Sequence, residues 1–85
     1  MTGNPLRDLF SRLLWDPNIK KSDYRIAYIS RGSTPGYEII SGDSVFKVTK
    51  DYLYIRKNGE VKAIPFHRIL YVEERGRRIY EKAVV

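Results

Sequence analysis

The stretch YLYIRKNGEVKAI, residues 52–64, decides the fold. Asn58 and Gly59 at its centre are the preferred pair for a two-residue type I′ hairpin turn, because both central positions of that turn need a positive φ. Folding the chain at this turn predicts three cross-strand pairs: Leu53 with Ile64 and Ile55 with Lys62 on one face, and Tyr54 with Ala63 on the other. The pattern of these pairs favours an antiparallel hairpin.

The segments on either side of this hairpin also alternate with the two-residue period of β-strands. Before it, strands are expected at residues 24–30, 37–40 and 45–49. After it, a second hairpin turns at Arg75-Gly76 and predicts three further pairs: Val72 with Ile79, Glu73 with Arg78, and Tyr71 with Tyr80. Apolar residues and opposite charges meet across this second hairpin, which supports the pairing.

Residues 4–14, NPLRDLFSRLL, predict one N-terminal helix. Asn4 suits the N-cap, Pro5 suits the first helical position, and Pro17 ends the helix. The helix carries one apolar stripe at helical spacing: Leu6, Leu9, Phe10, Leu13 and Leu14. We expect this stripe to cover one face of the sheet and Trp15 to lie in the core behind the helix.

One helix followed by about six short strands predicts the α+β class. The expected architecture is one N-terminal helix packed on a curved, mostly antiparallel sheet or a small partly open barrel. Eighty-five residues suffice for one modest core, so a single domain over residues 1–85 is expected.

Composition restricts the functional classes. The chain has no cysteine, which excludes disulfides and a thiolate zinc site and fits a reducing cytoplasm. No apolar run reaches the roughly 20 residues of a membrane span, and no signal peptide is expected, so we expect no membrane partner. Sixteen Lys and Arg against ten Asp and Glu give a net charge of +6. This excess favours a polyanionic partner such as nucleic acid, although small domains also carry basic charge for solubility.

The only histidine, His67, stands in IPFHRILYV, residues 64–72. A zinc site needs about four ligands, two-histidine phosphoesterases need a second imidazole, and no G-x-S-x-G nucleophile motif is present. The sequence therefore predicts no metal, no cofactor and no assigned catalytic residue. Two interpretations of the bend after Pro65 stay open. His67 and Arg68 donate hydrogen bonds to a phosphate, or His67 is a structural histidine beside a solvated arginine.

The loop SRGSTPG, residues 30–36, is a second candidate for phosphate binding. Arg31 and Gly32 at a strand end offer a guanidinium and an exposed amide, and Ser33 and Thr34 add hydroxyls. The loop matches no P-loop or dinucleotide fingerprint, and an ordinary turn explains it equally well.

Aromatic residues are the third candidate. Seven tyrosines, three phenylalanines and one tryptophan are interleaved with Lys and Arg. An exposed tyrosine such as Tyr28 or Tyr54 would stack a single-stranded base, as sheet-face RNA binders do. Half-buried packing is the alternative use of tyrosine in a small sheet.

Three stretches together resemble a known family: LLWDP at 13–17, YRIAYISRG at 24–32 and IPFHRILYVEERG at 64–76. Their order and spacing are similar to the RNA cyclic-group-end recognition domain, a small archaeal family. The resemblance implies recognition of RNA ends that carry a cyclic phosphate, and RNA-processing enzymes as partners. The matching polar positions are Arg31, Gly32, Asp43, His67 and Arg68. Ser30 stands where members often have histidine, which lowers the case for catalysis.

Three functions therefore stay open. The first is a non-catalytic RNA-binding module that holds a terminal or 2′,3′-cyclic phosphate. Its expected contacts are Arg31, Gly32, Ser33, His67 and Arg68, with Tyr28 or Tyr54 stacking the last base. The second is a weak RNA phosphoesterase with His67 as acid or base. The third is an adaptor that binds a protein through its tyrosine-bearing face, which should respond little to salt, whereas phosphate binding should respond steeply.

Overall fold

The computed structural model of the chain describes residues 5–32 and 36–82. Within these ranges one helix, α1 (Pro5–Trp15), precedes seven strands: β1 (Tyr24–Ile29), β2 (Tyr37–Ser41), β3 (Val45–Val48), β4 (Tyr52–Lys57), β5 (Glu60–Pro65), β6 (Ile69–Glu74) and β7 (Arg77–Glu81). Short 3₁₀ turns connect some of them: η1 (Lys21–Asp23), η2 (Gly42–Ser44) and η3 (Phe66–Arg68). No helix in the described ranges is long and apolar enough to cross a membrane.

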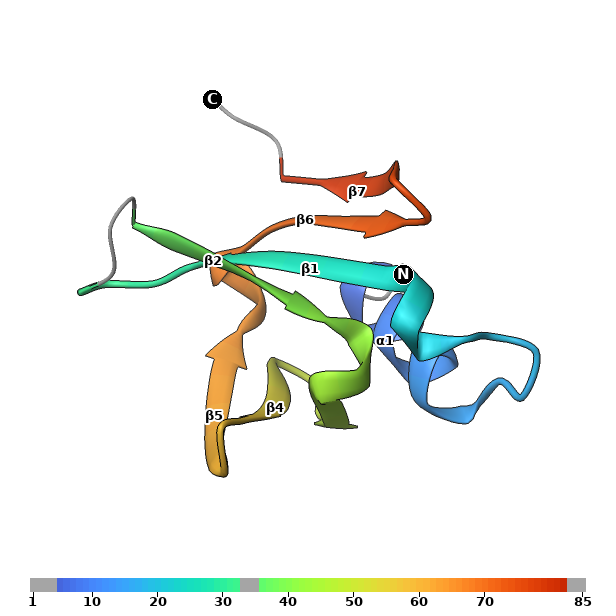
Figure 1. Cartoon of the computed structure of the whole chain (residues 1–85), viewed down its shortest axis with the longest axis horizontal. Helices are drawn as coiled ribbons and strands as arrows, with labels where there is room; N and C mark the ends of the chain where they lie inside the picture. Colours follow the sequence, from blue (N-terminus) through green and yellow to red (C-terminus); the bar gives the residue numbers. More distant parts are fainter. Residues whose placement is uncertain (1–4, 33–35, 83–85) are drawn as a thin grey trace.

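The strands form two antiparallel sheets (Figure 1). One has the order β2-β1-β6-β7 and the other the order β3-β4-β5, and the chain passes from the second to the first through η3. The predicted α+β fold with an N-terminal helix is confirmed. The described residues hold seven strands where about six were expected, and they do not close into a barrel.

The two predicted hairpins differ in outcome. All three pairs predicted across the first turn are observed, and Asn58 and Gly59 have φ values of 52° and 80°. In the second hairpin Glu73 pairs with Arg78 as predicted. The other two predictions, Val72 with Ile79 and Tyr71 with Tyr80, are wrong; the observed pairs are Val72 with Tyr80 and Tyr71 with Glu81. A β-bulge at this point shifts the register by one residue.

The helix packs its predicted stripe into the core. Leu6, Phe10 and Leu13 are buried, and Leu9 and Leu14 pack against the same cluster. The Phe10 ring lies 6.1 Å from the ring of Phe66, the first residue of η3. This contact fixes the turn that leads into β6, because a buried aromatic pair resists displacement.

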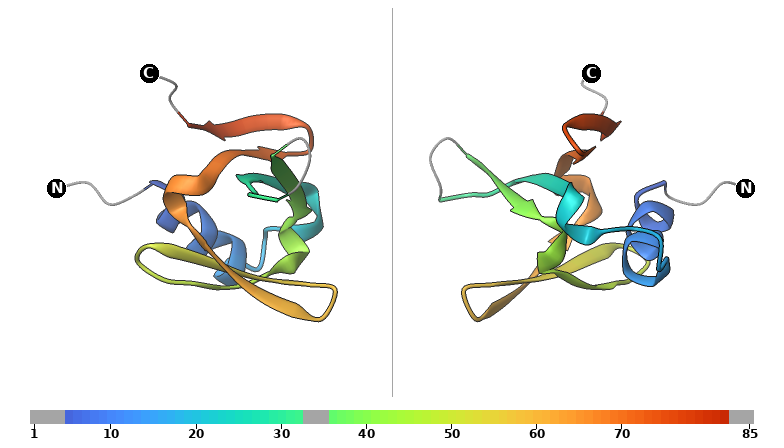
Figure 2. Two further views of the ribbon diagram at one scale, coloured as in Figure 1. Left: turned by 90° about the vertical axis from the view of Figure 1, so that its left-hand side faces the viewer. Right: turned by 45° about the vertical axis from the view of Figure 1, so that its right-hand side comes forward.

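The predicted core position of Trp15 is wrong, because its side chain is 80% exposed. A helix turns about 100° per residue, so position 15 lies about 200° around the axis from Leu13 and faces away from the stripe. α1 lies on one side of the molecule, and the end of β1 and the β4–β5 turn lie on the other (Figure 2).

Candidate functional site

An open pocket of about 330 Å³ lies between the end of β1 and strand β5. It is lined by Tyr28, Ile29, Ser30 and Arg31 from β1 and the turn after it, by Lys62, Ala63 and Ile64 from β5, and by Arg68 from η3. β5 is an edge strand, so no strand of the described residues pairs with its second edge. The volume is within the range of small-molecule sites, about 300–1,000 Å³.

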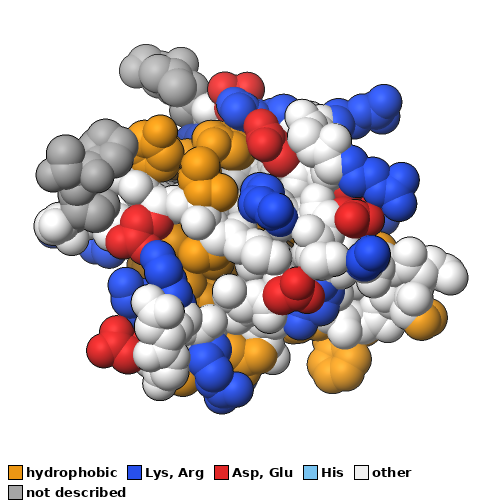
Figure 3. Space-filling model, in the orientation of Figure 1, with side chains coloured by type: hydrophobic (Ala, Val, Ile, Leu, Met, Phe, Trp, Pro, Cys, Tyr) orange, Lys and Arg blue, Asp and Glu red, His pale blue; other side chains and the backbone are white. Residues whose placement is uncertain are grey.

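The pocket is positively charged. Arg31, Lys62 and Arg68 come from three separate segments, and no carboxylate is among the lining residues. Within the described ranges none of these three side chains forms an ion pair or a side-chain hydrogen bond. Figure 3 shows Lys and Arg side chains, with some acidic ones, along the left and lower left of this face, near the ends of β1 and β5. Cations that have no acidic partner and surround one hollow attract an anion.

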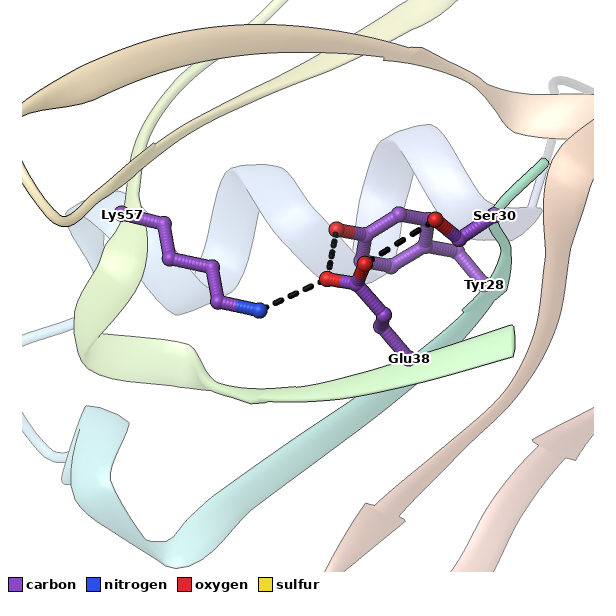
Figure 4. A network of polar contacts seen from close by, with 4 residues as sticks. All are labelled: Tyr28, Ser30, Glu38 and Lys57. Atoms are coloured by element: carbon purple, nitrogen blue, oxygen red, sulfur yellow. Dashed lines mark hydrogen bonds and ion pairs between the residues drawn. The ribbon is translucent and has the colours of Figure 1, made fainter. Parts of the chain in front are cut away.

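A hydrogen-bonded network supports one wall of the pocket (Figure 4). The Glu38 carboxylate on β2 accepts hydrogen bonds from the Tyr28 hydroxyl at 3.0 Å and the Ser30 hydroxyl at 2.9 Å. The Lys57 ammonium on β4 donates to the same carboxylate at 2.6 Å. Lys57 belongs to the three-stranded sheet and Glu38 to the four-stranded sheet, so the network ties the two sheets together beside the pocket.

The network also sets the ionisation of its members. Hydrogen bonds from Lys57, Ser30 and Tyr28 lower the pKa of Glu38 to about 2. Burial, and then the hydrogen bond to Glu38, raise the pKa of Tyr28 to about 12. Near neutral pH Glu38 is therefore a carboxylate and Tyr28 a neutral phenol, and neither is suited to exchange a proton with a ligand.

Three predicted site residues line this pocket: Tyr28, Arg31 and Arg68. Gly32 follows Arg31 at an exposed position with φ of 93°, a conformation that glycine adopts without strain. Ser33 and its neighbour Thr34 lie outside the described residues. Arg31 lines the pocket, whereas Gly32, the next residue, is not among its lining residues.

His67 does not line this pocket. It faces a separate open hollow of about 410 Å³ with Asp51, Tyr52, Pro65 and Phe66. The expectation that His67 and Arg68 point to one ligand is wrong, because consecutive residues of a 3₁₀ turn point about 120° apart. The backbone carbonyl of His67 accepts a hydrogen bond from the Lys82 ammonium at 2.6 Å.

The two tyrosines proposed for stacking differ. The expectation that the Tyr28 ring is exposed is wrong: it is 4% exposed and belongs to the core cluster, so no base reaches its face. Tyr54 is half-buried on the outer face of β4, opposite Ala63 of β5. Tyr28 is part of the wall of the pocket, whereas the Tyr54 side chain lies on the outside of the sheet.

Sequence reasoning missed Lys62 and Glu38. The sequence did carry a signal for Lys62, because the first hairpin pairs it with Ile55 on the inner face of the sheet. A lysine on that face has to extend its ammonium to solvent at the edge of the core. Glu38 had no comparable signal, since its bond to Lys57 depends on how the two sheets meet. Asp43, also matched by the resemblance, is exposed in η2, and its backbone N–H donates to the Ser41 hydroxyl at 3.2 Å.

Comparisons with known proteins agree with one another. A family model described as the MJ1316 RNA cyclic group end recognition domain matches residues 3–82. A UPF0248 protein of Methanopyrus kandleri is 41% identical over 70 residues, which cover 82% of this chain and 89% of that protein. A UPF0248 protein of Methanococcus vannielii is 33% identical over 79 residues, covering 91% of this chain and 90% of that protein. A third UPF0248 protein, from Pyrobaculum aerophilum, is 34% identical over 67 residues, which cover 79% of this chain and 83% of that protein. No solved structure matches the chain.

Proposed function

The chain belongs to the RNA cyclic group end recognition domain family, shared with archaeal UPF0248 proteins, and from this premise we propose that it binds RNA ends. The ligand is a terminal or 2′,3′-cyclic phosphate, held in the pocket between β1 and β5 without catalysis. One observation carries the proposal. Arg31, Lys62 and Arg68 surround that pocket, and within the described residues no acid neutralises them.

Each part of the pocket has a role in this proposal. The guanidinium groups of Arg31 and Arg68 donate paired hydrogen bonds to phosphate oxygens, and the Lys62 ammonium adds a third charge. The amide of Gly32, an exposed residue that directly follows Arg31, is a further donor to the phosphate in this proposal. The apolar side chain of Ile64 is buried at the pocket and excludes water from one side of the ligand.

The base of the last nucleotide is placed on Tyr54. Ala63 lines the pocket and also stands opposite Tyr54 in the β4–β5 ladder. Side chains of opposite residues in such a ladder start about 5 Å apart, on the same face of the sheet. A nucleotide whose phosphate enters the pocket at Ala63 can therefore lay its base across β5 towards the Tyr54 ring.

The ionisation of the pocket supports binding over chemistry. Glu38 stays ionised and Tyr28 stays protonated near neutral pH, and His67 faces another hollow. A protein that only holds the RNA end leaves its processing to a partner, and we propose that an RNA-processing enzyme receives the end from this module.

The test is a titration of a short single-stranded RNA, followed by fluorescence anisotropy, with three chemical ends: 2′,3′-cyclic phosphate, 3′-phosphate and free hydroxyls. The wild type should bind both phosphate ends more tightly than the hydroxyl end, and Arg31→Gln and Arg68→Gln should reduce that preference. Arg7→Gln removes the same charge from the exposed side of α1 and should preserve it. Equal affinity of the wild type for all three ends would refute end recognition.

A further inference from the structure

The outer face of the three-stranded sheet carries a cluster of three aromatic rings. Tyr52 and Tyr54 alternate along β4 with two buried residues, so both point outward. Their ring centroids lie 6.4 Å apart, and the Phe46 ring of β3 lies 6.5 Å from Tyr54 in an edge-to-face arrangement. Tyr54 thus stands between two further rings.

A β-bulge makes this cluster possible. Val45 pairs with Ile55 and Lys47 pairs with Tyr54, so Phe46 is an extra residue in β3. At a bulge two residues of one strand stand opposite a single residue of the other, which brings Phe46 and Lys47 to the same side of the sheet. The bulge therefore adds both a ring and a cation to the face that β4 already makes aromatic.

The rings are exposed and accompanied by positive charge. Phe46 is 40% and Tyr52 is 41% exposed, so both rings are accessible to a ligand. The Lys47 ammonium lies 5.3 Å from the centre of the Tyr54 ring, and the Arg56 guanidinium lies 4.8 Å from that of Phe46. In Figure 3 hydrophobic side chains reach the lower edge of the molecule, the region of β3 and β4 in Figure 1.

We propose that this aromatic face, defined by Phe46, Tyr52 and Tyr54 with Lys47 and Arg56, binds the single-stranded nucleotides that precede the RNA end. The proposal deepens the function proposed above and rests on it for the identity of the ligand. Stacked bases are sequence-tolerant partners for aromatic rings, and lysine and arginine beside the rings meet the phosphates between the bases.

The spacing of the rings selects a single strand. In duplex DNA successive nucleotides of one strand rise by about 3.4 Å. The rings of the face stand 6.4 and 6.5 Å apart, so they do not match consecutive bases of a stacked helix. They suit bases that are splayed apart, each against its own ring, which is how proteins read single-stranded RNA.

The face is continuous with the phosphate pocket through β5. Ala63 lines the pocket and stands opposite Tyr54, so the ring nearest the pocket is the central ring of the cluster. The side chain of Ala63 is small, so it does not obstruct an RNA strand that crosses β5. One strand of RNA can thus place its terminal phosphate in the pocket, its last base on Tyr54 and earlier bases on Phe46 or Tyr52.

The experiment replaces rings by leucine, which keeps apolar surface but removes stacking. Tyr52→Leu and Phe46→Leu are titrated with single-stranded RNA oligonucleotides that end in a cyclic phosphate or in free hydroxyls. Each loss should be roughly 5- to 100-fold and equal for the two ends. Tyr52→Phe keeps a ring and should bind like the wild type. The matched control is Tyr37→Leu, which removes an equally exposed tyrosine (41%) from the other sheet.

The outcomes separate this inference from the proposed function. One outcome is that the wild type prefers phosphate ends while the leucine variants bind RNA with wild-type affinity. In that case the aromatic face does not bind bases, and the inference is overturned. If the leucine variants lose affinity while the wild type binds phosphate-ended and hydroxyl-ended RNA equally, the aromatic face binds RNA and the proposed end recognition is refuted. Losses that Tyr37→Leu shares, or equal binding of duplex RNA, would also overturn the inference.

Discussion

Lys62 gives the sharpest test of the pocket, because it is the pocket cation that motif comparison did not identify. The substitution Lys62→Gln removes one of three charges at the pocket and keeps the length of most of the side chain. A hydrogen bond to a charged group contributes about 1.5–3 kcal/mol, and the exposure of Lys62 places it at the lower end. A loss of about 1.5 kcal/mol corresponds to roughly tenfold weaker binding of a phosphate-ended RNA.

Salt dependence supplies a second magnitude. For a single strand, each neutralised phosphate adds about 0.7 to the slope of log affinity against log salt. Lys62→Gln should therefore flatten that slope by up to about 0.7 for phosphate-ended RNA. It should leave the slope for hydroxyl-ended RNA close to the wild-type value, because that ligand places no terminal phosphate in the pocket.

The assay is fluorescence anisotropy with both RNA ends over a salt range of about 50–200 mM. Lys20→Gln is the control, since it removes the same charge from an exposed lysine that lies outside the pocket. The reasoning is refuted if Lys62→Gln and Lys20→Gln weaken binding equally, or if Lys62→Gln affects the two ends alike. Either result would mean that Lys62 affects RNA binding only through the net charge of the protein.

Three further predictions test neighbouring features. His67→Gln should leave the preference for phosphate ends unchanged, because His67 faces a different hollow; a lost preference in the anisotropy assay would contradict the assignment. Glu38→Gln should remove a pH-dependent stabilisation: the folded pKa of Glu38, about 2, lies below its usual 4.5, so the stabilisation is present above pH 4.5 and is lost as the pH falls towards 2. Urea unfolding of both proteins across this range should show curves that converge in acid, and a constant difference would disprove the linkage. Gly42→Ala should cost about 1–3 kcal/mol, and hence at least about 4 °C in thermal unfolding, since a Cβ there would stand 2.4 Å from the Lys21 carbonyl oxygen. An unchanged melting temperature would show that the two 3₁₀ turns move apart freely.

Local sequence rules predict the parts of this fold that depend on a few adjacent residues. The Asn58-Gly59 turn requires positive φ at both positions, and that requirement alone sets the register of β4 and β5. The helix likewise follows from Pro5 and an apolar stripe at helical spacing. The resemblance drawn from three motifs is confirmed by the family match over residues 3–82.

The errors arise where geometry depends on distant packing. The bulge in the second hairpin is not encoded by its turn, so pairing beyond Glu73 and Arg78 slips by one residue. Trp15 is apolar, yet its angular position on the helix places it in solvent. This error is different in kind: the apolar type of Trp15 suggested a core residue, although the angular spacing of the helix stripe, which can be read from the sequence, already places position 15 on the exposed side.

The candidate site shows the same division. Arg31 and Arg68 were predicted to share a pocket, and they do, because both stand at the ends of elements that converge there. His67 was assigned to that pocket by its position next to Arg68. The 3₁₀ turn that separates their directions is set by Phe66, which is anchored on α1, and no local motif reveals that contact.

The open edge of β5 is what makes the proposed function physically consistent. In a closed barrel a neighbouring strand would pair with that edge and fill the space beside Ile64. Here the edge instead lines the pocket, and the bond between Lys57 and Glu38 holds the two sheets together beside it. A small fold that left this edge uncovered without function would expose backbone groups that invite aggregation. The positive charge of Lys62 discourages strand pairing with another copy of the chain. The same charge attracts the phosphate of the ligand, which then covers the pocket beside the open edge.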